Sequence, residues 1–305
     1  MEKVIITGAT SMVGIALLNQ LISSNVKVFA IIRKNSNHKK RLPDSELVTI
    51  AECDLSELNQ FIPNCDGDFD VFYHLGWSNT QRKYLNDPYK QNENISFTLD
   101  AIELAHRMGC KAFIGIGSQA EYGKMFSKAN PYQNVRPETA YGIAKYSAGR
   151  LGLLLCQQYE MNFIWGRIFS LYGPYDREDS MLMYAIKKLV NNEKPSFTSC
   201  EQFWDYLYIQ DAGLALYMIG LYGKNQAVYN IASGNSLPLR EYIQDLSRTI
   251  GNSCPLGFGE IDNPVAQNLS LFADISNLTQ DTGFRPQTQF TDGIKKTIDW
   301  YIANK

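Results

Sequence analysis

Hydrophobic residues recur in short blocks through the first half of the chain, and most blocks are followed by a longer stretch with helical spacing. The blocks are rich in β-branched residues, which predicts strands at 4–6, 26–32, 48–50, 70–75, 112–116 and 162–169. Between them, apolar positions three and four residues apart predict helices at 15–24, 95–108 and 141–159. This alternation predicts an α/β fold with a doubly wound parallel sheet and helices on both faces.

The pattern changes after Tyr172-Gly173-Pro174. Helical pieces at 181–190 and 239–250 are then separated by turns rather than by long strands. We therefore expect a first domain over residues 1–172 and a smaller carboxy-terminal domain that takes up most of 173–305.

Composition narrows the class of protein. The chain has 305 residues, 45% of them hydrophobic and 20% charged, and its formal net charge is -2. This balance excludes a disordered protein and argues against nucleic acid or an anionic membrane as the main partner. No leader or membrane-spanning run is evident, so we expect a cytoplasmic protein. The six cysteines form no CxxC pair and only three histidines are present, so we expect neither a metal site nor disulfides.

The first strand leads into a glycine-containing turn, Thr7-Gly8-Ala9-Thr10-Ser11-Met12-Val13-Gly14, and then into a helix. Such a turn directs backbone N–H groups and the positive end of a helix at a pyrophosphate. Gly8 permits the turn and Gly14 permits close packing of helix on strand, whereas Ser11 stands where a glycine normally lets the diphosphate approach. We expect the pyrophosphate of a dinucleotide to lie against Gly8, Thr10, Ser11, Met12, Val13 and Gly14.

Several further motifs together resemble the extended short-chain dehydrogenase/reductases, the family of NAD(P)-dependent nucleotide-sugar epimerases, dehydratases and reductases. They are Tyr141-Gly-Ile-Ala-Lys145, Asp54-Leu55, 70–76, 170–174, 228–234 and 274–286. The resemblance implies a Rossmann-type cofactor domain over 1–172, joined by a returning segment at about 205–235, and a substrate-binding domain mainly in 173–305. It also implies cofactor contacts from Asp54, Leu55, Leu75, Gly76, Trp77, Asn94 and Phe169.

Two of these assignments have simpler alternatives. Asn94 opens the helix predicted at 95–108 and is equally suited to be its N-cap. Trp77 either covers the nicotinamide or fills core beneath a loop. His74, at the end of the fourth strand, is expected to be satisfied by backbone rather than to act as a base.

The second strand ends in Ile31-Ile32-Arg33-Lys34, without the acidic residue that accepts from the ribose hydroxyls of NAD. Arg33 stands where NADP-dependent members of the family carry arginine, and a 2′-phosphate requires a cation. NADP(H) is therefore favoured over NAD(H). The alternative is that Arg33 and Lys34 are solvated loop charges.

Ser118, Tyr141 and Lys145 are the candidate catalytic residues. Tyr141 and Lys145 are one helical turn apart, and Ser118 follows a predicted strand 23 residues before Tyr141. A nearby ammonium stabilises a phenolate and lowers the pKa of the phenol. By resemblance, Lys145 also holds the nicotinamide ribose and Ser118 polarises the substrate carbonyl. The alternative is that Tyr141 and Lys145 have this spacing by chance. The presence of Ser118 at the end of the expected strand argues against it.

Residues 119 and 120 select among the reactions of the family. Dehydratases carry an Asp-Glu pair where this chain has Gln119-Ala120, and epimerase-reductases that make deoxysugars such as fucose carry a cysteine at the position of Ala120. The resemblance then leaves NADPH-dependent reduction of an NDP-4-keto-6-deoxy sugar, or 4-epimerisation with retained NAD. A sensor that binds NADP without chemistry is a third alternative. The segments 117–123 and 201–207 resemble those of sugar reductases related to CDP-abequose synthase.

The substrate is expected to be a nucleotide-sugar. Trp204 precedes Asp205 where related epimerases have a diphosphate-binding arginine, and Arg177 is the candidate replacement, with a surface salt bridge as its alternative. The expected substrate contacts are Gln119, Glu121, Tyr122, Ser170, Arg177, Gln202 and Trp204. Gly149 and Gly152 fit close helix pairing in a homodimer, but equally fit tight packing on the sheet.

Overall fold

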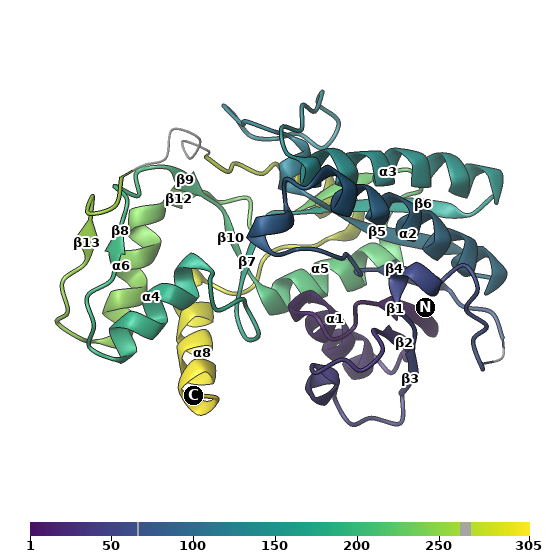
Figure 1. The fold of residues 1–305 in the computed structure, drawn as a ribbon, viewed down its shortest axis with the longest axis horizontal. Coiled ribbons are helices and arrows are strands. Elements are labelled where there is room, and N and C mark those ends of the chain that lie inside the picture. Colours follow the sequence, from purple (N-terminus) through teal and green to yellow (C-terminus); the bar gives the residue numbers. More distant parts are fainter. Residues whose placement is uncertain (66, 263–269) are drawn as a thin grey trace.

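A seven-stranded parallel sheet forms the centre of the protein in the computed structural model, which describes residues 1–65, 67–262 and 270–305 (Figure 1). The strand order is β11-β6-β5-β4-β1-β2-β3. The strands are β1 (Lys3–Thr7), β2 (Lys27–Ile32), β3 (Val48–Glu52), β4 (Val71–His74), β5 (Ala112–Ser118), β6 (Asn162–Ile168) and β11 (Val228–Ile231). The order reverses at β1, and the open end of such a sheet is where ligands bind.

Helices cover both faces of this sheet. Helices α1 (Met12–Ser23) and α5 (Ile209–Tyr222) pack together on one face, and α2 (Pro88–Arg107) and α3 (Ala140–Gln158) pack on the other (Figure 1). The alternation of side chains along β1 divides the core between the faces: Val4 and Ile6 join the cluster of α1 and α5, whereas Ile5 joins that of α2 and α3. The near-continuous hydrophobic strands follow from burial on both sides.

The second lobe, at the left of Figure 1, is built on α4 (Met181–Val190), α6 (Leu239–Ile250) and α8 (Phe290–Ala303). Helix α6 buries Leu239, Tyr242, Ile243 and Leu246, one stripe at helical spacing, and ends at Gly251 with φ 75°. Short strands form three further pairs: β7 (Ser170–Tyr172) with β10 (Tyr206–Tyr208) between the lobes, and β8 (Ser196–Phe197) with β13 (Gly257–Phe258) and β9 (Phe203–Trp204) with β12 (Leu237–Pro238) in the second lobe (Figure 1). A further helix, α7 (Ser276–Thr282), packs near β11 and α5.

The predicted elements are present, and the largest difference is at the start of α2. The sequence predicts a helix from 95, but α2 begins at Pro88 because the Asp87 carboxylate accepts from the N–H groups of Tyr89 and Lys90. Proline at the first helical position needs no hydrogen-bond partner. Asn94 therefore lies inside α2, and the expectation that it opens the helix is wrong.

Among the described residues, no helix is both long and apolar enough to cross a membrane. In the same part of the chain, no three His, Cys, Asp or Glu side chains gather in a way that could hold a metal ion.

Candidate active site

The turn after β1 is held in a shape that only glycine permits at two positions. Gly8 has φ 72°, and a Cβ there would lie 2.8 Å from the backbone nitrogen of Gly76. A Cβ at Gly14 would lie 2.4 Å from the carbonyl oxygen of Gly8. Ser11 caps α1, because its hydroxyl accepts from the N–H of Gly14 at 3.0 Å. The first-turn N–H groups of α1 that have no partner within the helix thus point beyond the strand end.

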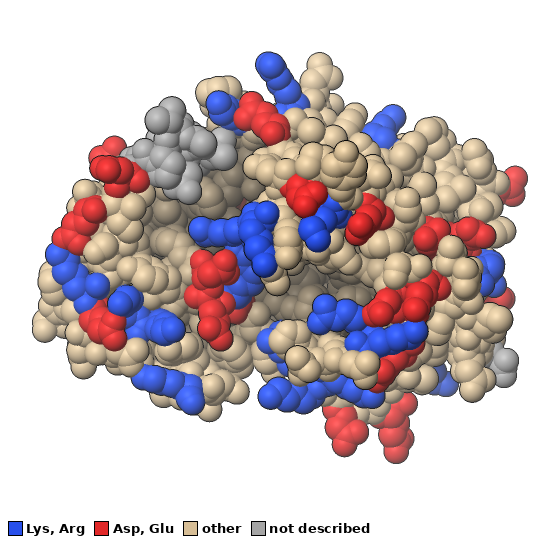
Figure 2. Space-filling model, viewed as in Figure 1, with Lys and Arg blue, Asp and Glu red and all other residues tan. Residues whose placement is uncertain are grey.

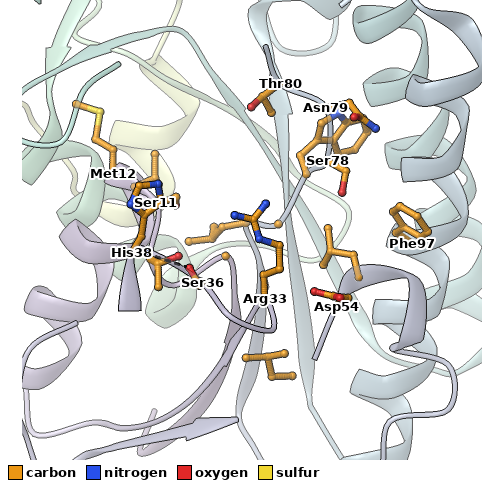
Figure 3. A pocket seen from close by; sticks show the side chains of 18 of the residues that line it. Ser11, Met12, Arg33, Ser36, His38, Asp54, Ser78, Asn79, Thr80 and Phe97 are labelled. Carbon is orange, nitrogen blue, oxygen red and sulfur yellow. Dashed lines mark hydrogen bonds between the residues drawn. The ribbon is translucent and has the colours of Figure 1, made fainter. Parts of the chain in front are cut away.

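A cleft of about 1110 Å³ opens at this end of the sheet. Figure 2 shows it as a hollow with Lys and Arg side chains along its rim. Figure 3 shows side chains from the turn after β1, the end of β2 and the loop after β4 around it. It brings together many of the residues expected to bind the cofactor: Gly8, Thr10, Ser11, Met12, Val13, Arg33, Asp54, Leu55, Leu75, Gly76 and Trp77.

The loop after β2 makes one wall of this cleft positively charged. Arg33 lies there together with Ser36, His38 and Arg41. Burial and then the charges of Arg41, Arg33 and Lys40 lower the pKa of His38. The Arg41 guanidinium also lies 4.9 Å from the centre of the Tyr175 ring, across the cleft. Ser36, His38 and Arg41 were not predicted to line the cleft, although the basic run 38–41 stands out in the sequence.

Lys34 does not share this position. Its ammonium group pairs with the carboxylate of Glu57 at 2.6 Å, and the hydrogen bond and charge of Glu57 raise the pKa of Lys34. Lys34 is not among the residues that line the cleft, and its contact with the cofactor stays a prediction. The Asp54 carboxylate lines the cleft and accepts from the backbone N–H of Lys34 at 3.1 Å, which fixes the end of β2.

Asn94 acts from beneath the cleft rather than within it. Its carboxamide accepts from the N–H of Ser78 at 2.6 Å and donates to the carbonyl of Ser78 at 3.2 Å. One helical turn earlier, the Gln91 amide donates to the carbonyl of Asn79 and accepts from the indole N–H of Trp77, each at 3.0 Å. Asn94 therefore fixes the loop after β4, and its direct contact with a cofactor stays a prediction.

His74 is held by side chains instead of backbone, contrary to expectation. Its Nδ1 lies 2.9 Å from the Thr7 hydroxyl, and its Nε2 lies 3.5 Å from that of Thr98. Burial, with a smaller contribution from Lys145, lowers the pKa of His74 to about 3. The imidazole is therefore neutral at physiological pH and joins β1, β4 and α2.

Lys145 is buried on α3 with few polar neighbours. Its ammonium donates to the carbonyl of Ile116 at 2.6 Å and lies 3.6 Å from the centre of the Trp77 ring. Burial lowers the pKa of Lys145 to about 7, against an opposing effect of Glu121. Its Nζ lies 5.9 Å from the centre of the Tyr141 ring.

Tyr141 stands between this lysine and Ser118. Burial raises the pKa of Tyr141 to about 12, while the Ser118 hydroxyl and the charge of Arg177 oppose the rise. The Trp77 ring, which lines the cleft, meets the Tyr141 ring edge-on at 6.0 Å. Ser118 ends β5 and caps the short helix 119–121. The fold thus gathers Ser118, Tyr141 and Lys145 beside the cofactor cleft.

Three residues expected to contact ligands are buried in the protein. The Glu121 side chain is 0% exposed and pairs with Arg167 at 2.7 Å. The Tyr122 hydroxyl donates to the Asn230 side chain at 2.6 Å. Phe169 packs against Tyr122 with ring centres 6.1 Å apart. The Glu121 carboxylate is therefore already occupied on both oxygens. The contacts expected of Tyr122 and Phe169 stay predictions, because Ser118 and Lys145 are buried to a similar degree.

The other expected substrate residues lie at the junction of the lobes. Arg177 lines the cleft and donates to the carbonyl of Thr80, while also pairing with Asp179 at 3.1 Å. Ser170 lies in β7, opposite Tyr206 of β10, and Gln119 lies in the turn after Ser118. The carbonyl of Gln202 accepts from the N–H of Leu239 at 2.9 Å. None of Gln119, Ser170 and Gln202 is among the residues lining the 1110 Å³ cleft.

Trp204 has a polar atom without a partner. Its indole N–H is buried, and no acceptor bonds it among the described residues. Next to it, the fully buried Asp205 carboxylate accepts from the N–H and hydroxyl of Ser233 and the N–H of Gly234. Burial raises the pKa of Asp205 to about 6. Asp205 thus holds the segment after β11 against β9 and β10.

The chain is similar to known proteins along most of its length. The model of the NAD dependent epimerase/dehydratase family matches residues 4–232. The CDP-abequose synthase of Salmonella muenchen is 25% identical over 305 residues, with 97% of each chain covered. The dTDP-glucose 4,6-dehydratase of Streptomyces antibioticus is 21% identical, with 99% of this chain and 93% of the other covered.

A solved structure has the same fold along its whole length. The UDP-N-acetylglucosamine 4-epimerase from Methanobrevibacter ruminantium M1 superposes with a TM-score of 0.89 at 22% identity, covering 100% of this chain and 99% of that one. The Rossmann-type fold and the resemblance to the extended short-chain dehydrogenase/reductases are both confirmed. The chain therefore belongs to the NAD dependent epimerase/dehydratase family of enzymes.

Proposed function

We propose that the protein reduces the 4-keto group of a nucleotide-activated 4-keto-6-deoxy sugar with NADPH. The observation that carries this proposal is the cleft itself: a dinucleotide turn, a cationic wall at the end of β2, and Ser118, Tyr141 and Lys145 at the other side of Trp77. The likeness to a CDP-abequose synthase supports the sugar class.

The residues present fit a phosphorylated dinucleotide. Gly8 and Gly14 let the turn and the start of α1 pack closely on Gly76 and on the turn itself, which directs the amino end of α1 at the place expected for a diphosphate. Arg33, with Arg41 and His38 beside it, would hold a 2′-phosphate through charge-assisted hydrogen bonds. Asp54 is occupied by the N–H of Lys34 and has one further oxygen to accept from the adenine amino group.

The bound nicotinamide supplies the hydride in this chemistry, and the protein manages the proton. In the proposed reduction, the Tyr141 hydroxyl donates its proton to the sugar oxygen as the carbonyl carbon becomes a carbinol. The Ser118 hydroxyl donates a hydrogen bond to the same oxygen. The Lys145 ammonium stabilises the phenolate left on Tyr141, which then takes a proton from solvent. Trp77 covers Lys145 and keeps water from its ammonium.

Two features favour reduction over the other reactions. Gln119 and Ala120 follow Ser118, so these two positions offer no acid and base for dehydration, and the carboxylate of Glu121 is paired with Arg167. The charged wall at Arg33 favours a phosphorylated cofactor, and a 4-epimerase that returns its hydride to the same sugar has no need of an exchangeable NADPH. The NAD-retaining 4-epimerase is the second candidate, supported by the fold shared with a UDP-N-acetylglucosamine 4-epimerase.

The indole N–H of Trp204 is suited to a substrate oxygen. A buried donor without an acceptor costs about 1–3 kcal/mol, and a phosphate or sugar oxygen of the substrate would remove that cost. We expect Trp204→Phe, which keeps a ring and loses the donor, to raise the KM for the sugar nucleotide about fivefold to tenfold. The KM for NADPH is the internal control and should stay within twofold. An unchanged sugar KM would show that Trp204 does not contact substrate.

A panel of NDP-4-keto-6-deoxy sugars, varied in base and in sugar, tests the function directly. When the protein is incubated with NADPH and each sugar, the absorbance of NADPH at 340 nm should fall with at least one member of the panel. Protein that arrives with bound NAD and interconverts 4-epimers without added cofactor would instead support the epimerase. Binding of NADP with neither activity would leave the sensor alternative.

A further inference from the structure

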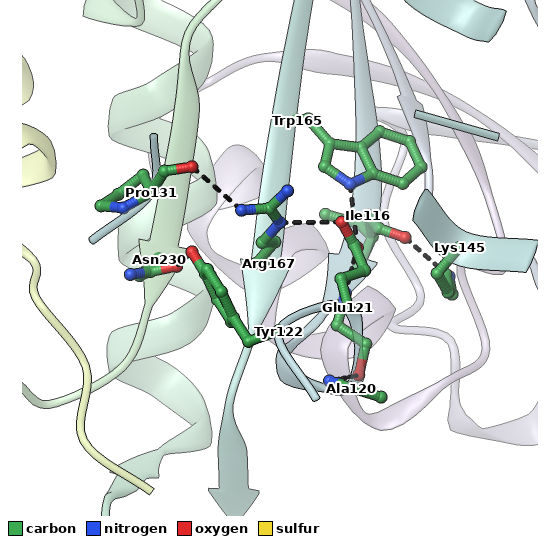
Figure 4. A network of polar contacts seen from close by, with 10 residues as sticks. Ile116, Ala120, Glu121, Tyr122, Pro131, Lys145, Trp165, Arg167 and Asn230 are labelled. Carbon is green, nitrogen blue, oxygen red and sulfur yellow. Dashed lines mark hydrogen bonds and ion pairs between the residues drawn. The ribbon is translucent and has the colours of Figure 1, made fainter. Parts of the chain in front are cut away.

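Glu121 joins a buried network that no sugar nucleotide reaches. One carboxylate oxygen accepts from the N–H of Ser118 at 2.8 Å and from the indole N–H of Trp165 at 3.0 Å. The other accepts from the Arg167 guanidinium at 2.7 Å, and Arg167 also donates to the carbonyl of Pro131 at 3.0 Å. Figure 4 shows these contacts converging on Glu121 beneath the end of β5.

The glycines of β5 make the space for this network. A Cβ at Gly117 would lie 2.2 Å from the Glu121 carboxylate, and one at Gly115 would lie 2.3 Å from the Trp165 ring. A Cβ at Gly149 on α3 would lie 2.8 Å from the same ring. Packing and hydrogen-bond donors therefore both fix the position of the carboxylate. Because the carboxylate is buried, water does not screen its charge as it would at the surface.

Lys145 approaches the same strand end. Its ammonium donates to the carbonyl of Ile116, and Glu121 accepts from the N–H of Ser118, two residues along β5. In an extended strand these two groups point toward the same side, because orientation repeats at every second residue. A fixed negative charge and a buried amine thus lie at adjoining points of one strand, close to the Tyr141 hydroxyl.

We propose that Glu121 is a positioning residue with two roles. Its negative charge keeps the Lys145 amine protonated, and its hydrogen bond to the backbone N–H of Ser118 fixes Ser118 in place. The proposal depends on the proposed function only for the catalytic role of Lys145. The Lys145 amine otherwise faces Trp77, Tyr141 and the neutral His74.

The electrostatic effects agree with this arrangement. Burial lowers the pKa of Lys145 to about 7, and Glu121 is the group that opposes this effect. A lysine with that pKa is charged below neutrality and loses its proton as the pH rises. Removing the charge of Glu121 should lower the pKa of Lys145 further. Lys145 should then lose its proton at a lower pH. Glu121 also raises the pKa of Tyr141, against the charge of Arg177, but a phenol with a pKa of about 12 stays protonated over the pH range of the test.

The first test is the pH profile of Glu121→Gln with NADPH saturating. We expect the alkaline limb of kcat/KM for the keto-sugar to move to lower pH by about one unit. Activity should fall about tenfold at pH 8.5 and by less than about threefold at pH 6, as a one-unit move requires. A structural role alone would lower kcat/KM by the same factor at both pH values. The control is Asp281→Asn, another ion-paired carboxylate, whose partners are Lys224 and Tyr229 away from the cleft.

A second variant keeps the test decisive if the unpaired Arg167 prevents folding. Glu121→Gln with Arg167→Met removes both buried charges, which is generally tolerated far better than removing one. Carbon-13 NMR of lysine side chains, with Lys145→Met to assign the signal, then gives the titration midpoint of Lys145 without any substrate. The matched reference is Arg167→Met, which differs from the double variant only in the charge at position 121, and a midpoint below that of Arg167→Met supports the inference. An unchanged midpoint overturns it, whether or not the keto-sugar is turned over.

The two proposals can fail separately. A lowered midpoint in a protein that reduces no keto-sugar would retain the role of Glu121 and discard the proposed reaction. Keto-sugar reduction with an unmoved midpoint and a parallel pH profile would retain the reaction and discard the role of Glu121.

Discussion

Tyr141→Phe should lower kcat for keto-sugar reduction by about 1,000-fold, which is within the range for loss of a general acid. The substitution keeps the ring that packs edge-on against Trp77 and removes only the hydroxyl that donates the proton. The KM for the sugar nucleotide should change by less than threefold, because the ring and the Ser118 hydroxyl remain. The measurement is steady-state oxidation of NADPH.

Tyr146→Phe is the matched control, since it makes the same chemical change further along α3. It should retain the parental rate. If Tyr141→Phe also reduced the sugar at the parental rate, the proton would come from another group, and the assignment of Ser118, Tyr141 and Lys145 would be wrong.

Reversal of charge at Arg33 should produce the second largest effect. Arg33→Glu places a carboxylate where the 2′-phosphate is expected, so it replaces a charge-assisted hydrogen bond with repulsion. We expect the ratio of kcat/KM for NADPH to that for NADH to fall about 100-fold, equivalent to about 2.7 kcal/mol. The value of kcat/KM for NADH should change by less than about threefold, because NADH carries no 2′-phosphate.

Lys40→Glu controls for the general loss of positive charge. Lys40 is exposed in the same loop and is not among the residues that line the cleft. It should leave the cofactor ratio nearly unchanged. Equal losses for NADPH and NADH in Arg33→Glu would remove the case for a phosphorylated cofactor and favour the NAD-retaining epimerase.

Sequence reasoning predicted the parts of the fold that depend on local periodicity. The parallel strands are buried on both faces, so their hydrophobic runs are visible without knowledge of any contact. The start of α2 was missed because a single capping residue, Asp87, decides it, and the polar residues of the first turns show little apolar periodicity. The residues of the turn after β1 were found because glycine has a steric role there that the sequence displays.

Three of the expected site residues have partners that residue spacing does not reveal. Glu121 and Tyr122 directly follow Ser118, and closeness in sequence suggested closeness to the ligand. In the fold their side chains turn inward, toward Arg167 and Asn230, residues that are 46 and 108 positions away. Lys34 was likewise grouped with Arg33, although its charge is matched by Glu57. Pairings of this kind depend on tertiary contacts that residue spacing cannot supply.

The destination of the hydride tests the central claim most directly. The protein is incubated with an NDP-4-keto-6-deoxy sugar and NADPH deuterated on the transferred position of the nicotinamide. The account predicts one deuterium at C4 of each product sugar and one NADP⁺ released for each sugar reduced. A product that forms without deuterium at C4 and without net consumption of NADPH would contradict it.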